Sequence, residues 1–411
     1  MVLLQNIFKK EEFEFMKWTN KGHQFDDLGN LLRNKKRVYI YGAAQLGKNL
    51  FDLLNQCNAW LHWDICFVDA NPDKQKCGYY GVKVLSPEEF FSLSAEEHFV
   101  VITASPANTA EITLNLMKAG YLPDVTVFPF EKFVNFYLPI HSIYQHDIVF
   151  VSSQNVIPST VCNLNCRSCL NFNPYIKQHI TDSLSELKKD IDTFFSVVDF
   201  IYRFQISGGE PFMFSGLADL IKYIGENYRH KIHKFETVTN GTVVPSDKMC
   251  HYFKKYNVHI FLDDYRKAIK NDDKYNIVQE KLKINRIEYT NNYVEKWFDL
   301  APLTTDHSMW SDEQLMNYFN KCANPWSNLR RQKISSCNYA HYAAKAGINS
   351  DYSDEYFDLT KITADNKKEF IEFRLGYNEK GYVNFCKKCA GFSTINTNIV
   401  EAGEQASKRT R

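Results

Sequence analysis

The chain has 411 residues, enough for two or three domains with separate cores. Apolar residues make up 44% and charged residues 24%, as in a folded globular protein, and the net charge of +1 excludes strong attraction to nucleic acid or to an anionic membrane. The opening MVLLQNIFKKEEFEF carries charge too early for a signal peptide, and no stretch approaches the roughly 18 apolar residues of a membrane span. These features predict a cytoplasmic protein.

The 11 cysteines are an odd number in a chain without an export signal, which favours metal or redox chemistry over a disulfide framework. Four of them are scattered, at positions 57, 66, 77 and 250. The other seven form a patterned group in the second half of the chain: Cys162, Cys166, Cys169, Cys322, Cys337, Cys386 and Cys389.

The first section, residues 1–145, alternates strand-like and helical patterns. RVYIY, DICFV and HFVVI read as strands with helical stretches between them, which predicts a Rossmann-like parallel sheet. Gly42, Ala44 and Gly47 occupy the positions of G-x-G-x-x-G, and Asp69 follows Gly47 by 22 residues, where a ribose-binding acid would lie. Alanine at the middle position leaves two interpretations open: a nucleotide site at Gly42, Gly47 and Asp69, or a Rossmann-like module without a cofactor.

The second section, residues 146–300, contains five strand-like stretches separated by helical patterns. They lie within 147–157, 197–212, 234–245, 258–265 and 283–292. Polar residues and glycines gather at the ends of these stretches, in SGGEP, TNG and LDDY. Active sites in α/β sheets and barrels are built at the carboxyl edge of the strands, so we expect the site there.

The stretch TVCNLNCRSC places Cys162, Cys166 and Cys169 at spacing C-x3-C-x2-C. A structural zinc site normally has four protein ligands, whereas three thiolates on a 4Fe–4S cluster leave one iron open. That iron could bind the amino and carboxylate groups of S-adenosylmethionine (SAM). A metal-stabilised loop without catalysis is the alternative.

The cysteine triplet, SGGEP at 207–211 and TNG at 239–241, in this order, resemble the radical SAM superfamily over residues 150–295. The resemblance implies cluster ligation by Cys162, Cys166 and Cys169. It also implies SAM binding by Ser207, Gly208, Gly209 and Glu210, with Glu210 accepting from the SAM ammonium, and it places Asn240 and Asp263 facing SAM or substrate. Ser168 stands where an aromatic residue is common, so the adenine contact is expected elsewhere, for example at Phe172.

The third section, residues 301–411, holds Cys322, Cys337, Cys386 and Cys389. Their pattern resembles the SPASM or twitch extensions of radical SAM enzymes and implies one auxiliary 4Fe–4S cluster, although RRQKISSC replaces the usual glycine before the second cysteine. A zinc site and unpaired core thiols are the alternatives. The polar tail EAGEQASKRTR is expected to fray. Four further residues could line a substrate pocket or belong to the core: Trp297, Asp299, Trp326 and Arg330.

The sequence thus predicts an α/β protein with a Rossmann-like sheet, a radical SAM partial (β/α)6 barrel and a small cysteine-ligated extension. The radical SAM resemblance implies hydrogen abstraction from the substrate, with an external flavodoxin- or ferredoxin-type electron donor. The N-terminal module resembles small Rossmann-like domains attached to enzymes of surface-polysaccharide and sugar-nucleotide pathways, which favours a carbohydrate or nucleotide-sugar substrate and dehydrogenation or epimerisation. Cys250 could donate hydrogen in an epimerase, but a core thiol is the favoured interpretation. The alternatives are a peptide-modifying maturase, or a non-catalytic nucleotide-binding scaffold stabilised by metal.

Overall fold

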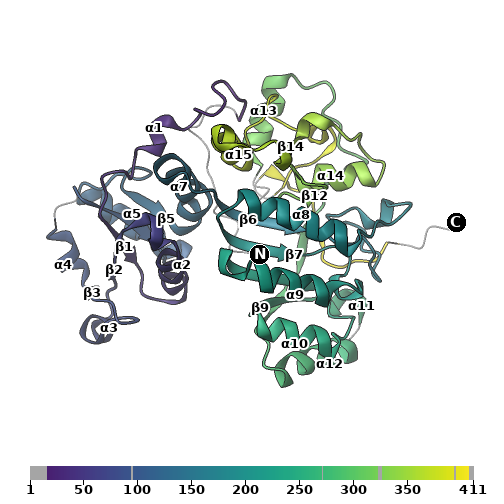
Figure 1. The fold of residues 1–411 in the computed structure, drawn as a ribbon, viewed down its shortest axis with the longest axis horizontal. Coiled ribbons are helices and arrows are strands. Elements are labelled where there is room, and N and C mark those ends of the chain that lie inside the picture. The colour runs from purple at the N-terminus through teal and green to yellow at the C-terminus, as the bar shows by residue number, and fades with distance from the viewer. Residues whose placement is uncertain (1–15, 94–95, 271, 323–325, 393–394, 407–411) are drawn as a thin grey trace. The chain divides into compact units, whose positions relative to one another are not determined.

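The computed structural model describes residues 16–93, 96–270, 272–322, 326–392 and 395–406. The chain forms two compact units, one of His23–Ser152 and one of Met1–Gly22 together with Ser153–Arg411 (Figure 1). The expected domain boundary at 145 falls inside a helix that runs to His146, and section 301–411 belongs to the same unit as the second sheet. Among the described residues, no helix is long and apolar enough to cross a membrane. The N-terminal stretch MVLLQNIFKKEEFEF lies outside the described residues.

The first unit is built on a five-stranded parallel sheet in the order β3-β2-β1-β4-β5, the order of the first five strands of the Rossmann fold. All five residues of HFVVI are buried, which explains why this strand is a continuous apolar run. The strands are β1 (Arg37–Tyr41), β2 (Asp64–Val68), β3 (Val84–Leu85), β4 (His98–Ile102) and β5 (Val127–Pro129). The helices are α1 (Asp26–Gly29), α2 (Gln45–Leu61), α3 (Pro72–Cys77), α4 (Pro87–Phe91), α5 (Pro106–Lys118), α6 (Phe130–Lys132), η2 (Phe133–Tyr137) and α7 (Leu138–His146).

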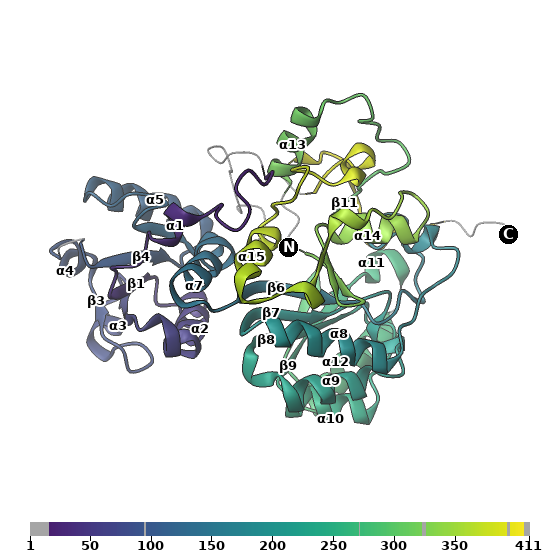
Figure 2. The same cartoon turned by 45° about the horizontal axis from the view of Figure 1, so that its top comes forward.

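The second sheet has five strands in the order β10-β9-β8-β7-β6, with parallel pairing from β7 through β10. These strands are β6 (Phe150–Val156), β7 (Phe200–Ile206), β8 (Ile232–Thr239), β9 (Val258–Asp264) and β10 (Tyr289–Tyr293). The helices between them, most of which line one face of the sheet in Figure 2, are α8 (Leu184–Val197), α9 (Leu217–Asn227), α10 (Asp247–Lys255), α11 (Arg266–Ile269) and α12 (Asp272–Ile284). The predicted α/β class with parallel sheets is confirmed, and the sheet is consistent with a partial barrel.

The remaining elements are short. They are β11 (Lys296–Phe298), β12 (Leu329–Arg330), β13 (Lys333–Ser335), β14 (Tyr356–Asp358), β15 (Ile399–Glu401), α13 (Asp312–Lys321), α14 (Asn338–Lys345), α15 (Lys367–Arg374) and the turns η3 (Asn173–Tyr175), η4 (Pro211–Met213), η5 (Arg229–Lys231), η6 (Ser353–Glu355), η7 (Leu359–Lys361), η8 (Ala364–Asn366) and η9 (Asn384–Lys388). β12, β13 and β14 form a small antiparallel sheet.

The expectation of a frayed tail is wrong as far as residue 406. β15 pairs antiparallel with β11, and Gln405 forms an antiparallel bridge with Cys166. The backbone hydrogen bonds of this segment are therefore satisfied by chain that lies far away in sequence. Residues 407–411 lie outside the described part of the chain.

Candidate active site

The cysteine triplet lies on the loop that follows β6, at the carboxyl edge of the second sheet. The loop turns tightly, because the Cys169 N–H donates to the Cys166 carbonyl (3.2 Å) and the Phe172 N–H donates to the Cys169 carbonyl (2.9 Å). The thiols of Cys162, Cys166 and Cys169 lie within electrostatic reach of one another. The structure thus brings the three predicted ligands together.

The protein alone does not stabilise these thiols in their charged form. Burial raises the pKa of Cys162 and that of Cys166 to about 12, and the neighbouring thiols add to the increase. Burial also raises the pKa of Cys169. Iron or another cation bound at the loop would supply the missing positive charge and displace the thiol protons.

The cysteine loop is surrounded by hydrogen-bond donors that suit thiolate ligands. The Leu164 N–H (3.4 Å) and the Asn240 amide (3.8 Å) point at the sulfur of Cys162, and the Gln405 amide (3.3 Å) points at the sulfur of Cys166. The Ser168 hydroxyl is buried without a hydrogen-bond partner among the described residues. Amide donors on the sulfurs are typical of iron–sulfur clusters, so the residues present fit a three-thiolate cluster.

The SGGE stretch backs the same loop. The Gly209 N–H donates to the Ser159 carbonyl (2.9 Å), and the Glu210 N–H donates to the Val161 carbonyl (2.8 Å). A Cβ at Gly208 would lie 2.6 Å from the Ser159 oxygen, and one at Gly209 would lie 2.1 Å from the Val161 oxygen. Glycine is needed at both positions because the two backbones touch.

The Ser207 hydroxyl donates to the side-chain amide oxygen of Asn155 (2.8 Å), which ties the start of SGGE to β6. The SAM contacts predicted for Ser207, Gly208 and Gly209 stay predictions.

Glu210 is 2% exposed and joins the SGGE stretch to the TNG stretch. Its carboxylate accepts from the N–H of Phe212 (3.0 Å), from the hydroxyl of Thr239 (2.8 Å) and from the N–H of Asn240 (2.8 Å). Burial raises its pKa to about 7, although these bonds act in the opposite direction. The carboxylate therefore holds the two stretches together, and its predicted contact with the SAM ammonium stays a prediction.

Asp263 is the next-to-last residue of β9, and the side chains of Tyr265 and Asn292 are hydrogen-bonded to its carboxylate. The Tyr265 hydroxyl donates to it (2.8 Å), as does the Asn292 amide (2.6 Å). Burial raises the pKa of Asp263 to about 6. Tyr265 lies within electrostatic reach of Cys166 and Cys169. Neither Tyr265 nor Asn292 is among the site residues predicted from the sequence, although Tyr265 belongs to the LDDY stretch at a strand end.

The other residues singled out lie in structural contacts. Cys250 is 1% exposed on the buried side of α10, as expected of a core thiol. The ring of Trp297 meets Tyr265 edge-on, and the Asp299 carboxylate accepts from the Ala301 N–H (2.8 Å). The ring of Trp326 lies against the Arg203 guanidinium, 5.2 Å from its centroid.

Phe172, considered for the adenine contact, is 3% exposed and packs edge-on against Phe385. Both rings belong to one apolar core with Cys337, Cys386 and Cys389. Phe172 thus connects the cysteine loop to the third section.

The four cysteines of the third section converge. Every pair among Cys322, Cys337, Cys386 and Cys389 is close enough to interact electrostatically. Helix ends position them, because Cys322 follows α13, Cys337 precedes α14 and Cys389 follows η9. Within the described residues, no three His, Cys, Asp or Glu side chains are placed to hold a single metal ion. Occupation by iron–sulfur or by zinc stays a prediction.

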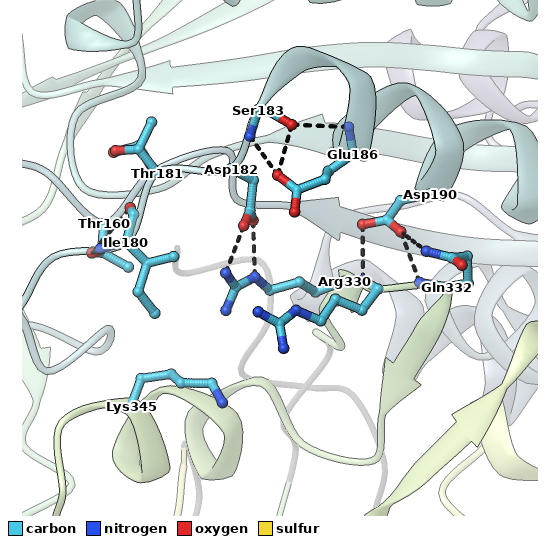
Figure 3. A network of polar contacts seen from close by, with 12 residues as sticks. Thr160, Ile180, Thr181, Asp182, Ser183, Glu186, Asp190, Arg330, Gln332 and Lys345 are labelled. Atoms are coloured by element: carbon cyan, nitrogen blue, oxygen red, sulfur yellow. Dashed lines mark hydrogen bonds and ion pairs between the residues drawn. The ribbon is translucent and has the colours of Figure 1, made fainter.

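The hairpin between Cys322 and Cys337 accounts for the missing glycine. Its turn residues, Arg331 (φ 52°) and Gln332 (φ 56°), adopt the left-handed backbone that usually selects glycine or asparagine. The Asp190 carboxylate, from α8, accepts from both of their N–H groups (2.9 and 2.7 Å), as Figure 3 shows in part. A buried acid thus offsets the strain that a glycine would avoid.

Arg330, on the same hairpin, forms a two-point ion pair with Asp182 at 2.8 and 2.6 Å (Figure 3). Both side chains are 12% exposed. The guanidinium of Arg330, a candidate for a substrate pocket, is therefore bound to the carboxylate of Asp182.

The dinucleotide fingerprint of the first unit is held by hydrogen bonds to Asp69. Asp69 accepts from the N–H of Ala43 (2.8 Å), from the N–H of Asn71 (2.9 Å) and from the Lys74 ammonium (3.1 Å). Burial alone would raise the pKa of Asp69, but these donors outweigh it and hold the pKa below its ordinary value. An ionised carboxyl group can accept about four hydrogen bonds, so these three donors leave room for a ribose hydroxyl and the nucleotide site stays a prediction.

Gly47 is needed for packing, since a Cβ there would lie 2.1 Å from the Gly42 oxygen. The Thr103 hydroxyl also donates to the Gly42 carbonyl (2.8 Å). Both glycines of the fingerprint thus have a structural role between β1, α2 and β4.

Residues 156–292 match the family model described as "Radical SAM superfamily". No curated protein matches the chain. Among solved structures, BtrN in complex with AdoMet and 2-DOIA is 15% identical, with 62% of this chain and 96% of that chain covered and a TM-score of 0.38. SuiB from Streptococcus suis bound to precursor peptide SuiA is 18% identical, with coverage of 59% and 54% and a TM-score of 0.31.

Native anSMEcpe with bound AdoMet and Cp18Cys peptide is 18% identical over 34% of this chain, with a TM-score of 0.27. The chain spans only 42% of the length of that protein. Likenesses this distant say nothing about the substrate. The family match covers the cysteine loop, SGGE, TNG and Asp263, and residues 156–292 are therefore a radical SAM superfamily domain.

Proposed function

We propose that the protein is a radical SAM enzyme that abstracts hydrogen from a carbohydrate or nucleotide-sugar substrate, leading to dehydrogenation or epimerisation. The single observation that supports this most is the meeting of all three motifs around Cys162. Its sulfur faces the amide of Asn240, and its loop is backed by Gly209 and Glu210. A loop that bound metal only for stability would need the three thiols, but it would not need SGGE or TNG beside them.

Cys162, Cys166 and Cys169 would hold a 4Fe–4S cluster. When bound, the cluster supplies the electron that cleaves SAM to methionine and a 5′-deoxyadenosyl radical. The residues of the chain fix the loop: SGGE is hydrogen-bonded to its back, and Phe172 packs in the third-section core.

Asp263 is the best placed proton acceptor for a dehydrogenation. It is half-buried at the carboxyl edge of the sheet, and its pKa of about 6 lies close to neutral pH, where a general base works efficiently. Oxidation of an alcohol carbon requires loss of the hydroxyl proton in addition to the hydrogen atom, and Asp263 could take that proton.

The four converging thiols of the third section would hold an auxiliary cluster that accepts the second electron of a dehydrogenation. All four ligands come from the protein, so this cluster would not bind SAM. The external electron donor, of flavodoxin or ferredoxin type, remains part of the proposal.

The test is anaerobic reconstitution followed by incubation with SAM, reductant and a panel of sugar nucleotides that carry deuterium on the ring carbons. Deuterium in 5′-deoxyadenosine, together with an oxidised or epimerised sugar, supports the proposal. Transfer only from a peptide panel would move the assignment to a peptide-modifying maturase. Zinc in place of iron, with no SAM cleavage, would favour the non-catalytic scaffold.

A further inference from the structure

The C-terminal segment 403–406 lies along the cysteine loop as an added strand. The Arg167 N–H donates to the Glu404 carbonyl (2.7 Å), and the Ala406 N–H donates to the Asn165 carbonyl (2.7 Å). Both bonds join residues more than 200 positions apart in the chain. The cysteine loop is thus paired with SGGE on one side and with the C-terminal segment on another.

Gln405 is the residue of this segment that points at the site. Its side-chain oxygen accepts from the Asn165 N–H (2.8 Å), and its amide nitrogen donates to the Cys166 sulfur (3.3 Å). The same nitrogen donates to the Gly403 carbonyl (2.7 Å), which fixes which end of the amide faces the sulfur. The amide orientation is therefore set by three partners.

A hydrogen bond to a cluster ligand affects the cluster electronically. Reduction adds negative charge that is shared by the sulfurs, so an N–H donor stabilises the reduced state more than the oxidised state and raises the potential. Cys162 receives such donors from the TNG stretch and from its own loop. The side-chain donor of Cys166 comes from the C-terminal segment instead.

We propose that Gln405 is a positioning residue that tunes the SAM-cleaving cluster, and that the C-terminal segment 403–406 is part of the active site. This inference rests on the proposed function, since it concerns the cluster that Cys162, Cys166 and Cys169 would hold. Gln405 raises the reduction potential of that cluster through its bond to Cys166.

The test compares two variants at this position with a matched control next to it. Gln405→Glu keeps the oxygen that accepts from Asn165 but replaces the donor with a negative charge, and Gln405→Ala removes both. Glu404→Gln is the control, because it removes only the exposed ion pair with Arg167 and leaves the backbone bonds of the segment in place. Hydrogen exchange of 160–170 reports whether the loop remains seated.

The readout is an anaerobic redox titration of the reconstituted full chain, followed by EPR. The SAM-cleaving cluster is identified as the signal that changes when SAM is added. We expect Gln405→Ala to lower the ratio of reduced to oxidised cluster at fixed potential about tenfold, equivalent to about 59 mV for one electron. Gln405→Glu should lower it further, and Glu404→Gln should match the wild type.

Wild-type potentials in both Gln405 variants would overturn the inference and leave the proposed function intact. The same holds if Gln405→Ala loosens the loop while Gln405→Glu keeps the wild-type potential, since the segment would then act only as a structural support. A wild-type chain with no SAM-responsive signal would instead overturn the proposed function itself.

Discussion

The strained hairpin between Cys322 and Cys337 depends on Asp190, and Asp190→Ala tests that dependence. The substitution removes three hydrogen bonds, two of them from the N–H groups of Arg331 and Gln332. An N–H group that loses its partner costs about 1–3 kcal/mol. Because water can reach this turn and replace part of the lost bonds, we expect the free energy of unfolding to fall by about 2 kcal/mol in total. For a unit of this size the loss lowers the melting temperature by about 3–4 °C.

The second effect falls on the auxiliary site. A loosened hairpin separates Cys322 from Cys337, so the Asp190→Ala variant should lose iron from the third section and retain the SAM-responsive cluster. Gln332→Gly should restore about 1 kcal/mol in the Asp190→Ala background, because glycine adopts the left-handed backbone without strain. The same change should be nearly neutral in the wild type.

The assay is thermal unfolding of the anaerobic chain with parallel iron analysis, and Lys189→Ala, on the exposed side of the same helix, is the control. The reasoning is refuted if Asp190→Ala melts with the control and keeps its full iron content. It is also refuted if Gln332→Gly fails to improve the variant.

Three further predictions concern the site and the first unit. Glu210→Gln should leave the Asn240 N–H facing an amide nitrogen and so destabilise the second unit by about 1–3 kcal/mol. Hydrogen exchange at 239–242 should become faster. Unchanged exchange would show that the carboxylate does not hold TNG. Gly209→Ala places a Cβ 2.1 Å from the Val161 oxygen and should prevent loading of the first cluster, seen as loss of the SAM-responsive EPR signal, whereas normal loading would contradict the close backing of the loop. His98 is kept neutral because burial lowers its pKa from 6.5 to about 4, so the unfolded chain binds a proton first as the pH falls. The contribution of neutral His98 to the free energy of unfolding is complete above about pH 6.5 and decreases towards pH 4 by at most about 3 kcal/mol. Denaturant unfolding should therefore show a weaker acid dependence in His98→Gln than in the wild type. Equal dependence in both proteins would count against this.

Local sequence patterns were sufficient to predict individual strands and close turns. Buried runs such as HFVVI and the glycines of SGGE indicate strands and close turns by themselves. The place of the cysteine loop at the carboxyl edge followed from its position directly after a predicted strand. Convergence of Cys322 with Cys386 followed only from the resemblance, since 63 residues lie between them.

The remaining features depend on partners that are distant in sequence. Gln405 sits in a polar tail that reads as unstructured, and its role appears only when the tail pairs with the cysteine loop. Asp190 reads as one polar residue of an amphipathic helix, with no local sign that it supports a turn about 140 positions away. Asp69 has the spacing of a ribose ligand, and its hydrogen bonds with the N–H groups of Ala43 and Asn71 are seen only in the folded chain.

The most direct test of the central claim is the anaerobic yield of 5′-deoxyadenosine from SAM and reductant. The comparison is between the wild type and a variant in which Cys162, Cys166 and Cys169 are all alanine. We predict formation of 5′-deoxyadenosine by the wild type and none by the variant, with the iron of the third section retained in both. Equal yields in the two proteins, or no product from an iron-loaded wild type, would contradict the account.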